Sequence, residues 1–228
     1  MSTIADNILD VSSRIKAATL AAKREENSVQ LLAVSKTKPA QDLRDAYAAG
    51  LRDFGENYLQ EALGKQLELA DLPLIWHFIG PIQSNKTRAI AEHFDWVHSV
   101  DRLKIAQRLS EQRPADLPPL NICIQVNVSG EASKSGCTPA DLPALAEAIS
   151  ALPRLKLRGL MAIPEPTEDR AAQDAAFAAV QRLQADLNLP LDTLSMGMSH
   201  DLESAIAQGA TWVRIGTALF GARDYGQP

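Results

Sequence analysis

The 228-residue chain has little cysteine and no long apolar run. Two cysteines, Cys123 and Cys137, cannot build the disulfide framework of a small secreted domain, so a reducing compartment is expected. The N-terminal segment is amphipathic with charged residues inside it, unlike a signal peptide. No stretch approaches the ~20 apolar residues of a membrane span. We therefore expect a cytoplasmic protein with no membrane partner.

Positive charge in excess is also lacking, because the formal net charge is −5. A nucleic-acid partner would need a basic field that this composition does not provide. The four histidines lack zinc-ligand spacing and neither cysteine lies in a CxxC pair, so no metal is expected. The GxSxG nucleophile elbow and the GxxxxGK[ST] phosphate loop are absent as well. An anionic ligand would have to be held by local donors.

What the chain does contain is a regular alternation of β-rich and helical runs behind a first helix. The helical runs carry apolar residues three and four positions apart, as helices that cover a sheet require. Eight strands are expected, at residues 31–36, 53–57, 74–80, 96–100, 121–127, 155–163, 192–197 and 211–216. This pattern predicts an α/β fold, a single (β/α)8 barrel of the TIM type, as one domain over 1–228 with an N-terminal helix.

An open, doubly wound sheet is the alternative architecture. It would need a glycine-rich dinucleotide turn after the first strand. The residues at that point, Lys36-Thr37-Lys38-Pro39, are not such a turn. The barrel is therefore favoured.

Lys36 is the most informative polar residue, because the strand ends of a barrel share one mouth. It lies two residues beyond Val34, so both side chains face the interior if Val34 does. A partly desolvated amine keeps more of its neutral, nucleophilic form, which imine formation with an aldehyde requires. The alternative is a lysine that leaves the strand end for solvent.

Two candidate anion sites follow the last two strands. Ser199 lies where a strand runs into a helix N-terminus, and backbone N–H groups there favour an anion. Alternatively, Ser199 only caps that helix, with Glu203 in its first turn. Arg214 ends the last strand, Gly216 permits close backbone approach, and Thr217 adds an N–H and a hydroxyl. Together these residues predict a site for a small polar or phosphorylated ligand.

Three further residues belong near the same mouth. Asn57 ends the second strand, and Lys134 is a second accessible amine in the loop after the fifth. His77 has apolar strand neighbours and is either close to a ligand or a hydrogen-bonded core residue.

Seven segments of the chain resemble the pyridoxal 5′-phosphate (PLP) homeostasis protein family, the YggS/PROSC group, which is related to the barrel domain of alanine racemase. They are AVSKTKP (33–39), FGENY (54–58), WHFIGPIQSNK (76–86), GEASKSG (130–136), GLMAI (159–163), LSMGMS (194–199) and RIGTALFG (214–221). The matches keep one order and span almost the whole chain from about residue 30.

The resemblance implies a fold-type III PLP barrel without the C-terminal β domain of alanine racemase. It also implies that Lys36 holds PLP as a Schiff base. By similarity, Ser199, Gly216 and Thr217 hold the phosphate, Arg214 faces the pyridine nitrogen, and Asn57 and His77 lie near the ring.

The resemblance further implies a role in intracellular PLP (vitamin B6) homeostasis, not catalysis. An arginine at the pyridine nitrogen disfavours a pyridinium and weakens the electron sink. The alternatives are a racemase-like PLP enzyme with an unrecognised second base, or a phosphate-ligand barrel enzyme without PLP. Expected partners are PLP and PLP-dependent apo-enzymes, and the expected state is a monomer.

Overall fold

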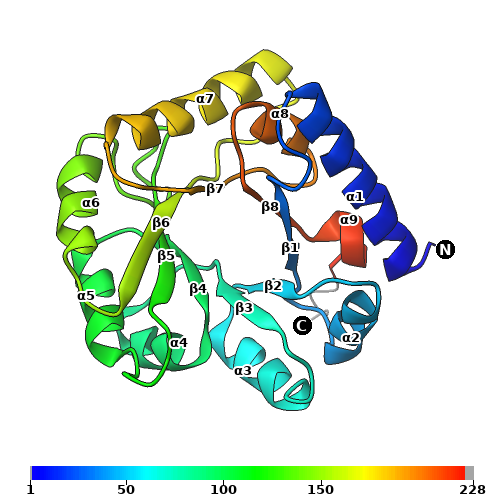
Figure 1. Cartoon of the computed structure of the whole chain (residues 1–228), viewed down its shortest axis with the longest axis horizontal. Coiled ribbons are helices and arrows are strands. Elements are labelled where there is room, and N and C mark those ends of the chain that lie inside the picture. The colour runs from blue at the N-terminus through cyan, green and yellow to red at the C-terminus, as the bar shows by residue number, and fades with distance from the viewer. Residues whose placement is uncertain (1, 224–228) are drawn as a thin grey trace.

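Eight parallel strands close into a barrel in which each strand pairs with its sequence neighbours and the first pairs with the last (Figure 1). This computed structural model describes residues 2–223. The strands are β1 (Gln30–Val34), β2 (Asp53–Glu56), β3 (Ile75–Phe78), β4 (Trp96–Val100), β5 (Leu120–Gln125), β6 (Leu155–Met161), β7 (Thr193–Ser195) and β8 (Trp212–Ile215). The barrel prediction is confirmed and the open sheet is wrong.

Helices surround the barrel on its outside (Figure 1). They are α1 (Ile4–Ala21), α2 (Ala40–Ala48), α3 (Leu59–Glu68), α4 (Thr87–His93), α5 (Leu103–Gln112), α6 (Leu142–Ser150), α7 (Arg170–Asp186), α8 (Leu202–Ala207) and α9 (Thr217–Phe220), with a 3-10 turn at Ser84–Lys86. Within residues 2–223, no helix is both long enough and apolar enough to cross a bilayer.

The first helix begins with a reciprocal cap and then lies against the last part of the barrel. The Thr3 side chain accepts from the Asp6 backbone N–H, and the Asp6 carboxylate accepts from the Thr3 N–H. Such a capping box satisfies two donors that the first turn leaves open. Figure 1 shows α1 running alongside α8 and α9, outside the barrel.

The strands bury apolar residues on both faces, because helices cover the outside and side chains fill the inside. On β1, Leu32 and Val34 point inward and pack with Ile79, whereas Ala33 belongs to the large cluster between sheet and helices. This alternation is the two-residue period of a strand. The inward direction of Val34 is the condition on which the placement of Lys36 depends.

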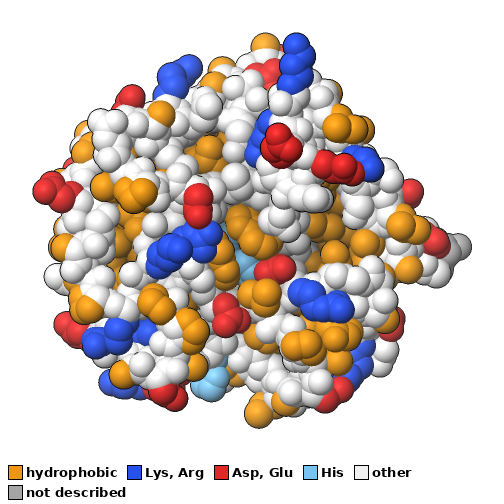
Figure 2. All heavy atoms as spheres, viewed as in Figure 1, with side chains coloured by type: hydrophobic (Ala, Val, Ile, Leu, Met, Phe, Trp, Pro, Cys, Tyr) orange, Lys and Arg blue, Asp and Glu red, His pale blue; other side chains and the backbone are white. Residues whose placement is uncertain are grey.

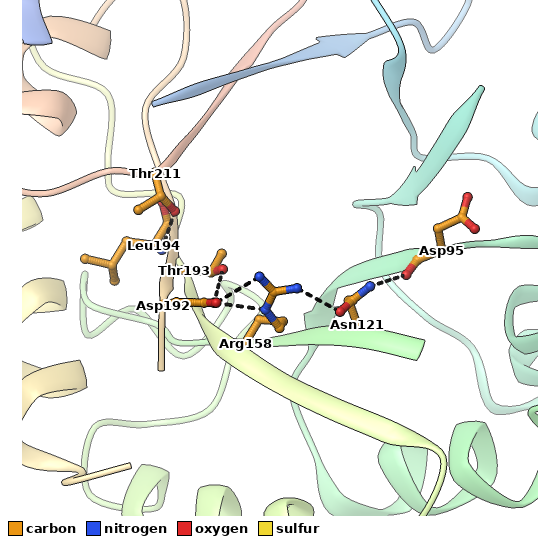
Figure 3. A network of polar contacts seen from close by, with 7 residues as sticks. All are labelled: Asp95, Asn121, Arg158, Asp192, Thr193, Leu194 and Thr211. Atoms are coloured by element: carbon orange, nitrogen blue, oxygen red, sulfur yellow. Dashed lines mark hydrogen bonds and ion pairs between the residues drawn. The ribbon is translucent and has the colours of Figure 1, made fainter. Parts of the chain in front are cut away.

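A polar network lies at the end of the barrel where the strands begin (Figure 3). The Arg158 guanidinium donates to both carboxylate oxygens of Asp192 at 2.9 Å and to Asn121 Oδ1 at 2.9 Å. It also lies over the Trp96 ring, 4.7 Å from the centroid. Arg158 therefore ties β6 to β5 and to the residue before β7. On the face seen in Figure 2, acidic and basic side chains are interspersed.

Candidate functional site

A cavity of about 270 Å³ opens among the loops that follow the strands. Its wall is formed by Val34, Lys36, Asn57, Ile79, Ile163, Met198, Ser199, His200, Arg214, Gly216, Thr217 and Arg223. Six of the seven residues expected at a ligand site are therefore brought together from β1, β2, β7 and β8 and the loops behind them. Lys36 reaches this wall because it follows Val34 by two positions.

His77 is the exception, since it does not line the cavity. Strand β3 continues through Phe78, and the Ile79 N–H donates to Glu56 O at 2.9 Å, so the rim position belongs to Ile79. His77 lies two residues earlier and faces the barrel interior, fully buried. The structure thus places it as the hydrogen-bonded core residue of the alternative interpretation.

The backbone on both sides of Lys36 is held by side chains of α3. The Lys65 amine donates to Ser35 O at 2.7 Å. The Thr37 N–H donates to Glu61 Oε1 at 2.6 Å. Thr37 itself has a φ of 65°, in the left-handed region that β-branched residues rarely adopt. The short segment that carries Lys36 therefore has a geometry set by its surroundings.

Lys65 belongs to a buried charged cluster beneath that segment. Its amine contacts Glu56 Oε1 at 2.8 Å and Glu61 Oε1 at 2.6 Å, and the Ser35 hydroxyl also donates to Glu56 Oε1 at 2.7 Å. Burial raises the pKa of the Glu56 carboxyl, and Lys65 opposes that shift. Sequence reasoning missed this cluster because its members share no local motif.

The region around Gly216 combines close packing with a cation. A side-chain carbon at Gly216 would lie 3.3 Å from Val34 O and 3.4 Å from the Arg223 guanidinium. Glycine therefore avoids a tight contact with Val34 and Arg223 at this point of the cavity wall. Arg223 was not expected from the sequence, because no motif extends to it.

The Ser199 loop is attached to the N-terminal helix. Arg14 of α1 donates to Ser199 O at 3.0 Å and pairs with both carboxylate oxygens of Glu203, at 2.8 and 3.0 Å. The residue that precedes α8 is Asp201, and its carboxylate accepts from the Met198 N–H. The interpretation of Ser199 as the helix cap is therefore wrong.

Arg214 brings a buried charge to the cavity. Its guanidinium donates to Ser195 Oγ at 2.9 Å and to Ala162 O at 2.9 Å, and only 4% of the residue is exposed. Burial lowers the pKa of Arg214 to about 10, so it remains a cation at neutral pH. Also on this wall, the buried Asn57 Oδ1 finds no hydrogen-bond partner within the described residues.

Lys134 lies at a neighbouring hollow of about 290 Å³, which shares Asn57, Ile79 and Ile163 with the main cavity. Its amine is 3.7 Å from Glu131. The second amine is therefore beside the site and not on its wall. Among residues 2–223, no group of three or more His, Cys, Asp or Glu side chains could hold a metal ion.

A family model described as the N-terminal domain of alanine racemase matches residues 12–224. The alanine racemase of Corynebacterium glutamicum is 17% identical with a TM-score of 0.66, over 96% of this chain and 62% of that one. Fold and match together define the class, which is an alanine racemase-type barrel.

More similar proteins narrow the class. The pyridoxal phosphate homeostasis protein of Pseudomonas aeruginosa is 78% identical, over 100% of this chain and 99% of its own length. That of Escherichia coli K12 is 54% identical over 99% of each chain. PipY of Synechococcus elongatus, solved with PLP bound, is 45% identical with a TM-score of 0.80, over 91% of this chain and 100% of its own. This chain belongs to the pyridoxal phosphate homeostasis protein family, as the resemblance predicted.

Proposed function

We propose that this protein binds PLP covalently through Lys36 and holds it for intracellular PLP homeostasis, without a dedicated substrate. The observation that carries the proposal is the composition of one cavity wall. It combines an amine, a buried guanidinium and two hydroxyls beside a glycine, contributed by Lys36, Arg214, Ser199, Thr217 and Gly216. The relatives named as homeostasis proteins, and the PLP bound to PipY, support this assignment.

The residues present fit PLP. Bound PLP supplies two groups, an aldehyde that can combine with an amine and a conjugated pyridine ring. Lys36 would provide the amine, and the Ser199 and Thr217 hydroxyls would donate to the phosphate, with Arg223 adding positive charge. The unpartnered Asn57 Oδ1 offers an acceptor to a donor on the ligand.

Arg214 is one reason to expect little turnover, and the need of a racemase for two well-placed bases is the other. A guanidinium only donates, so it cannot take a proton from the pyridine nitrogen or stabilise a pyridinium. The competing function is racemase-like and needs a second acid–base group. Among the described residues that line the cavity, His200 is the one imidazole. His200 is therefore the candidate for the second acid–base group, and the test must include it.

Proton exchange tests the functional proposal. PLP-loaded protein is incubated with L-amino acids in deuterated water, and loss of the α-proton is followed together with chirality. Without an essential acid–base group, we expect rates at least 10²–10⁴-fold below a typical ~10 s⁻¹. Rates near ~10 s⁻¹ that collapse in His200→Ala would establish the racemase instead.

Binding itself separates both PLP functions from a PLP-free phosphate enzyme. Titration with PLP should produce a visible absorption band in the wild type and in Lys134→Ala, but not in Lys36→Ala. If the wild type gives no band, the cavity serves another phosphorylated ligand.

The biological setting is part of the same proposal. We place the protein in the cytoplasm as a monomeric single domain over 1–228 that passes PLP to PLP-dependent apo-enzymes. The low cysteine content supports the compartment.

A further inference from the structure

Five side chains form a continuous series of hydrogen bonds through the inside of the barrel. Arg214 Nη1 is 2.9 Å from Ser195 Oγ, which is 2.7 Å from His98 Nδ1. His98 Nε2 is 2.9 Å from His77 Nδ1, and His77 Nε2 is 2.8 Å from Asp53 Oδ1. We call these five residues the interior network. It runs from the cavity wall to Asp53, the first residue of β2.

The two ends of the interior network determine its direction. A guanidinium can only donate, and an ionised carboxylate can only accept. Between them, a neutral imidazole donates from one nitrogen and accepts at the other, and a hydroxyl does both. With both imidazoles neutral, only one arrangement gives every hydrogen bond a donor and an acceptor.

In that arrangement, Arg214 donates to Ser195, and the Ser195 hydroxyl donates to His98 Nδ1. His98 Nε2–H then donates to His77 Nδ1, and His77 Nε2–H donates to Asp53. Both histidines are therefore Nε2–H tautomers. A change of tautomer at either ring would leave two acceptors facing each other, and at His77 two donors as well.

The surroundings of the rings support neutral imidazoles. His77 and His98 are fully buried, and the Trp96 and Trp212 rings lie 5.5 and 4.9 Å from the His77 ring. Burial lowers the pKa of His77, opposed by Asp53 and Asp95. Burial lowers the pKa of His98 further, with smaller contributions in the same direction from His77 and Arg214.

The neighbour of Arg214 is a hydroxyl, and the carboxylate lies four hydrogen bonds away. A directly paired carboxylate would offset the guanidinium charge that a ligand could use. The second hydrogen bond of Arg214, from Nη2 to Ala162 O, fixes the other nitrogen of the planar guanidinium. A donor whose orientation is already fixed loses less entropy when it binds a ligand.

We propose that Asp53, His77, His98 and Ser195 are positioning residues that orient the Arg214 guanidinium toward the cofactor ring from the opposite end of the barrel. The inference rests on the proposed function only for the identity of the ligand. The direction of the interior network is a property of the protein alone.

Nitrogen NMR of the histidines in apo-protein tests that direction without PLP. We expect His77 and His98 to be neutral Nε2–H tautomers at pH 7. An Nδ1–H tautomer or a charged ring at His98 would overturn the proposal, whatever the protein binds.

The second test breaks the middle of the interior network. Ser195→Ala removes both hydrogen bonds of this hydroxyl, to Arg214 and to His98. It should weaken PLP binding about 5-fold, with a shifted absorption maximum of the bound cofactor. Ser195→Thr keeps a hydroxyl and should restore both values. The matched control is Ser110→Ala, which deletes a buried hydroxyl bonded to Pro153 O, outside the interior network.

Asp53→Ala provides the same test at the partly exposed end, where folding is less at risk. It should mix the histidine tautomers and shift the spectrum, whereas Asp53→Asn retains an acceptor and should not. If PLP binds the wild type, Ser195→Ala and Asp53→Ala with equal affinity and identical spectra, the positioning role is wrong. If the wild type does not bind PLP, the proposed function fails and the NMR result alone decides the inference.

Discussion

Thr37, next to Lys36, adopts a left-handed backbone conformation with a φ of 65°. For a β-branched residue such a conformation costs about 1–3 kcal/mol and persists only when the surroundings impose it. Here the Glu61 carboxylate accepts from the Thr37 N–H, and the Lys65 amine donates to Ser35 O. At the residue scale, the position of Lys36 is therefore specified by Glu61 and Lys65, which do not line the cavity.

Thr217→Val tests the phosphate end at this scale. The substitution keeps the side-chain shape and removes one hydroxyl donor, which is worth about 1.5–3 kcal/mol toward a charged phosphate. We expect PLP binding to weaken correspondingly in a titration, and pyridoxal binding to change little. Equal losses for the two ligands would show that the phosphate lies elsewhere.

At the scale of elements, α1 does more than cover the barrel. Its Arg14 contacts Ser199 O and Glu203, so the helix fixes the loop that carries Ser199, a proposed phosphate donor. The two side chains of this ion pair are 39% and 37% exposed, and solvent reduces its contribution to about 0–1 kcal/mol.

Arg14→Met should therefore weaken PLP retention by a factor of about 2–5, with the fold intact. The matched control on the same helix is Lys16→Met, which removes the exposed pair with Glu26 and should leave retention unchanged. The measurement is the rate of PLP loss by dialysis. Equal rates in both variants would show that α1 does not support the site.

The spacing of apolar residues and the positions of turn residues predict where the strands lie, but not every residue of the site. All eight strands fall within or next to their expected ranges, because helix-covered strands are marked by apolar runs and turn residues. His77 was expected two positions too close to the rim, because strand tilt and register decide which inward layer a residue joins. Arg223 and Lys65 could not be found, because their contacts join segments without a shared motif.

At the scale of the whole molecule, the barrel has two different ends with a polar interior between them. One end is tied together by Arg158 and its partners, and the other opens into the cavity. Between them lie two neutral histidines, His77 and His98, whose burial lowers their pKa values.

These histidines predict how stability depends on pH. In the unfolded chain both titrate near ~6.5, so between that value and the lower folded pKa values the unfolded state binds more protons. Their contribution to the free energy of unfolding is therefore complete above pH ~6.5 and is lost as the pH falls. Urea unfolding should show a decline between about pH 6.5 and 5. His98→Gln should flatten it, whereas replacement of the exposed His93 should not. A constant free energy of unfolding down to pH 5 would contradict this.

The covalent attachment of PLP to Lys36 is the central claim, and borohydride reduction tests it most directly. Reduction makes the bond between an amine and the bound cofactor permanent, so peptide mapping by mass spectrometry identifies the lysine. We predict one pyridoxyl group per chain, on Lys36, and none in Lys36→Ala, whose fold should be unchanged because the residue lies at the rim. Modification mainly on Lys134 or Lys38 would contradict the account.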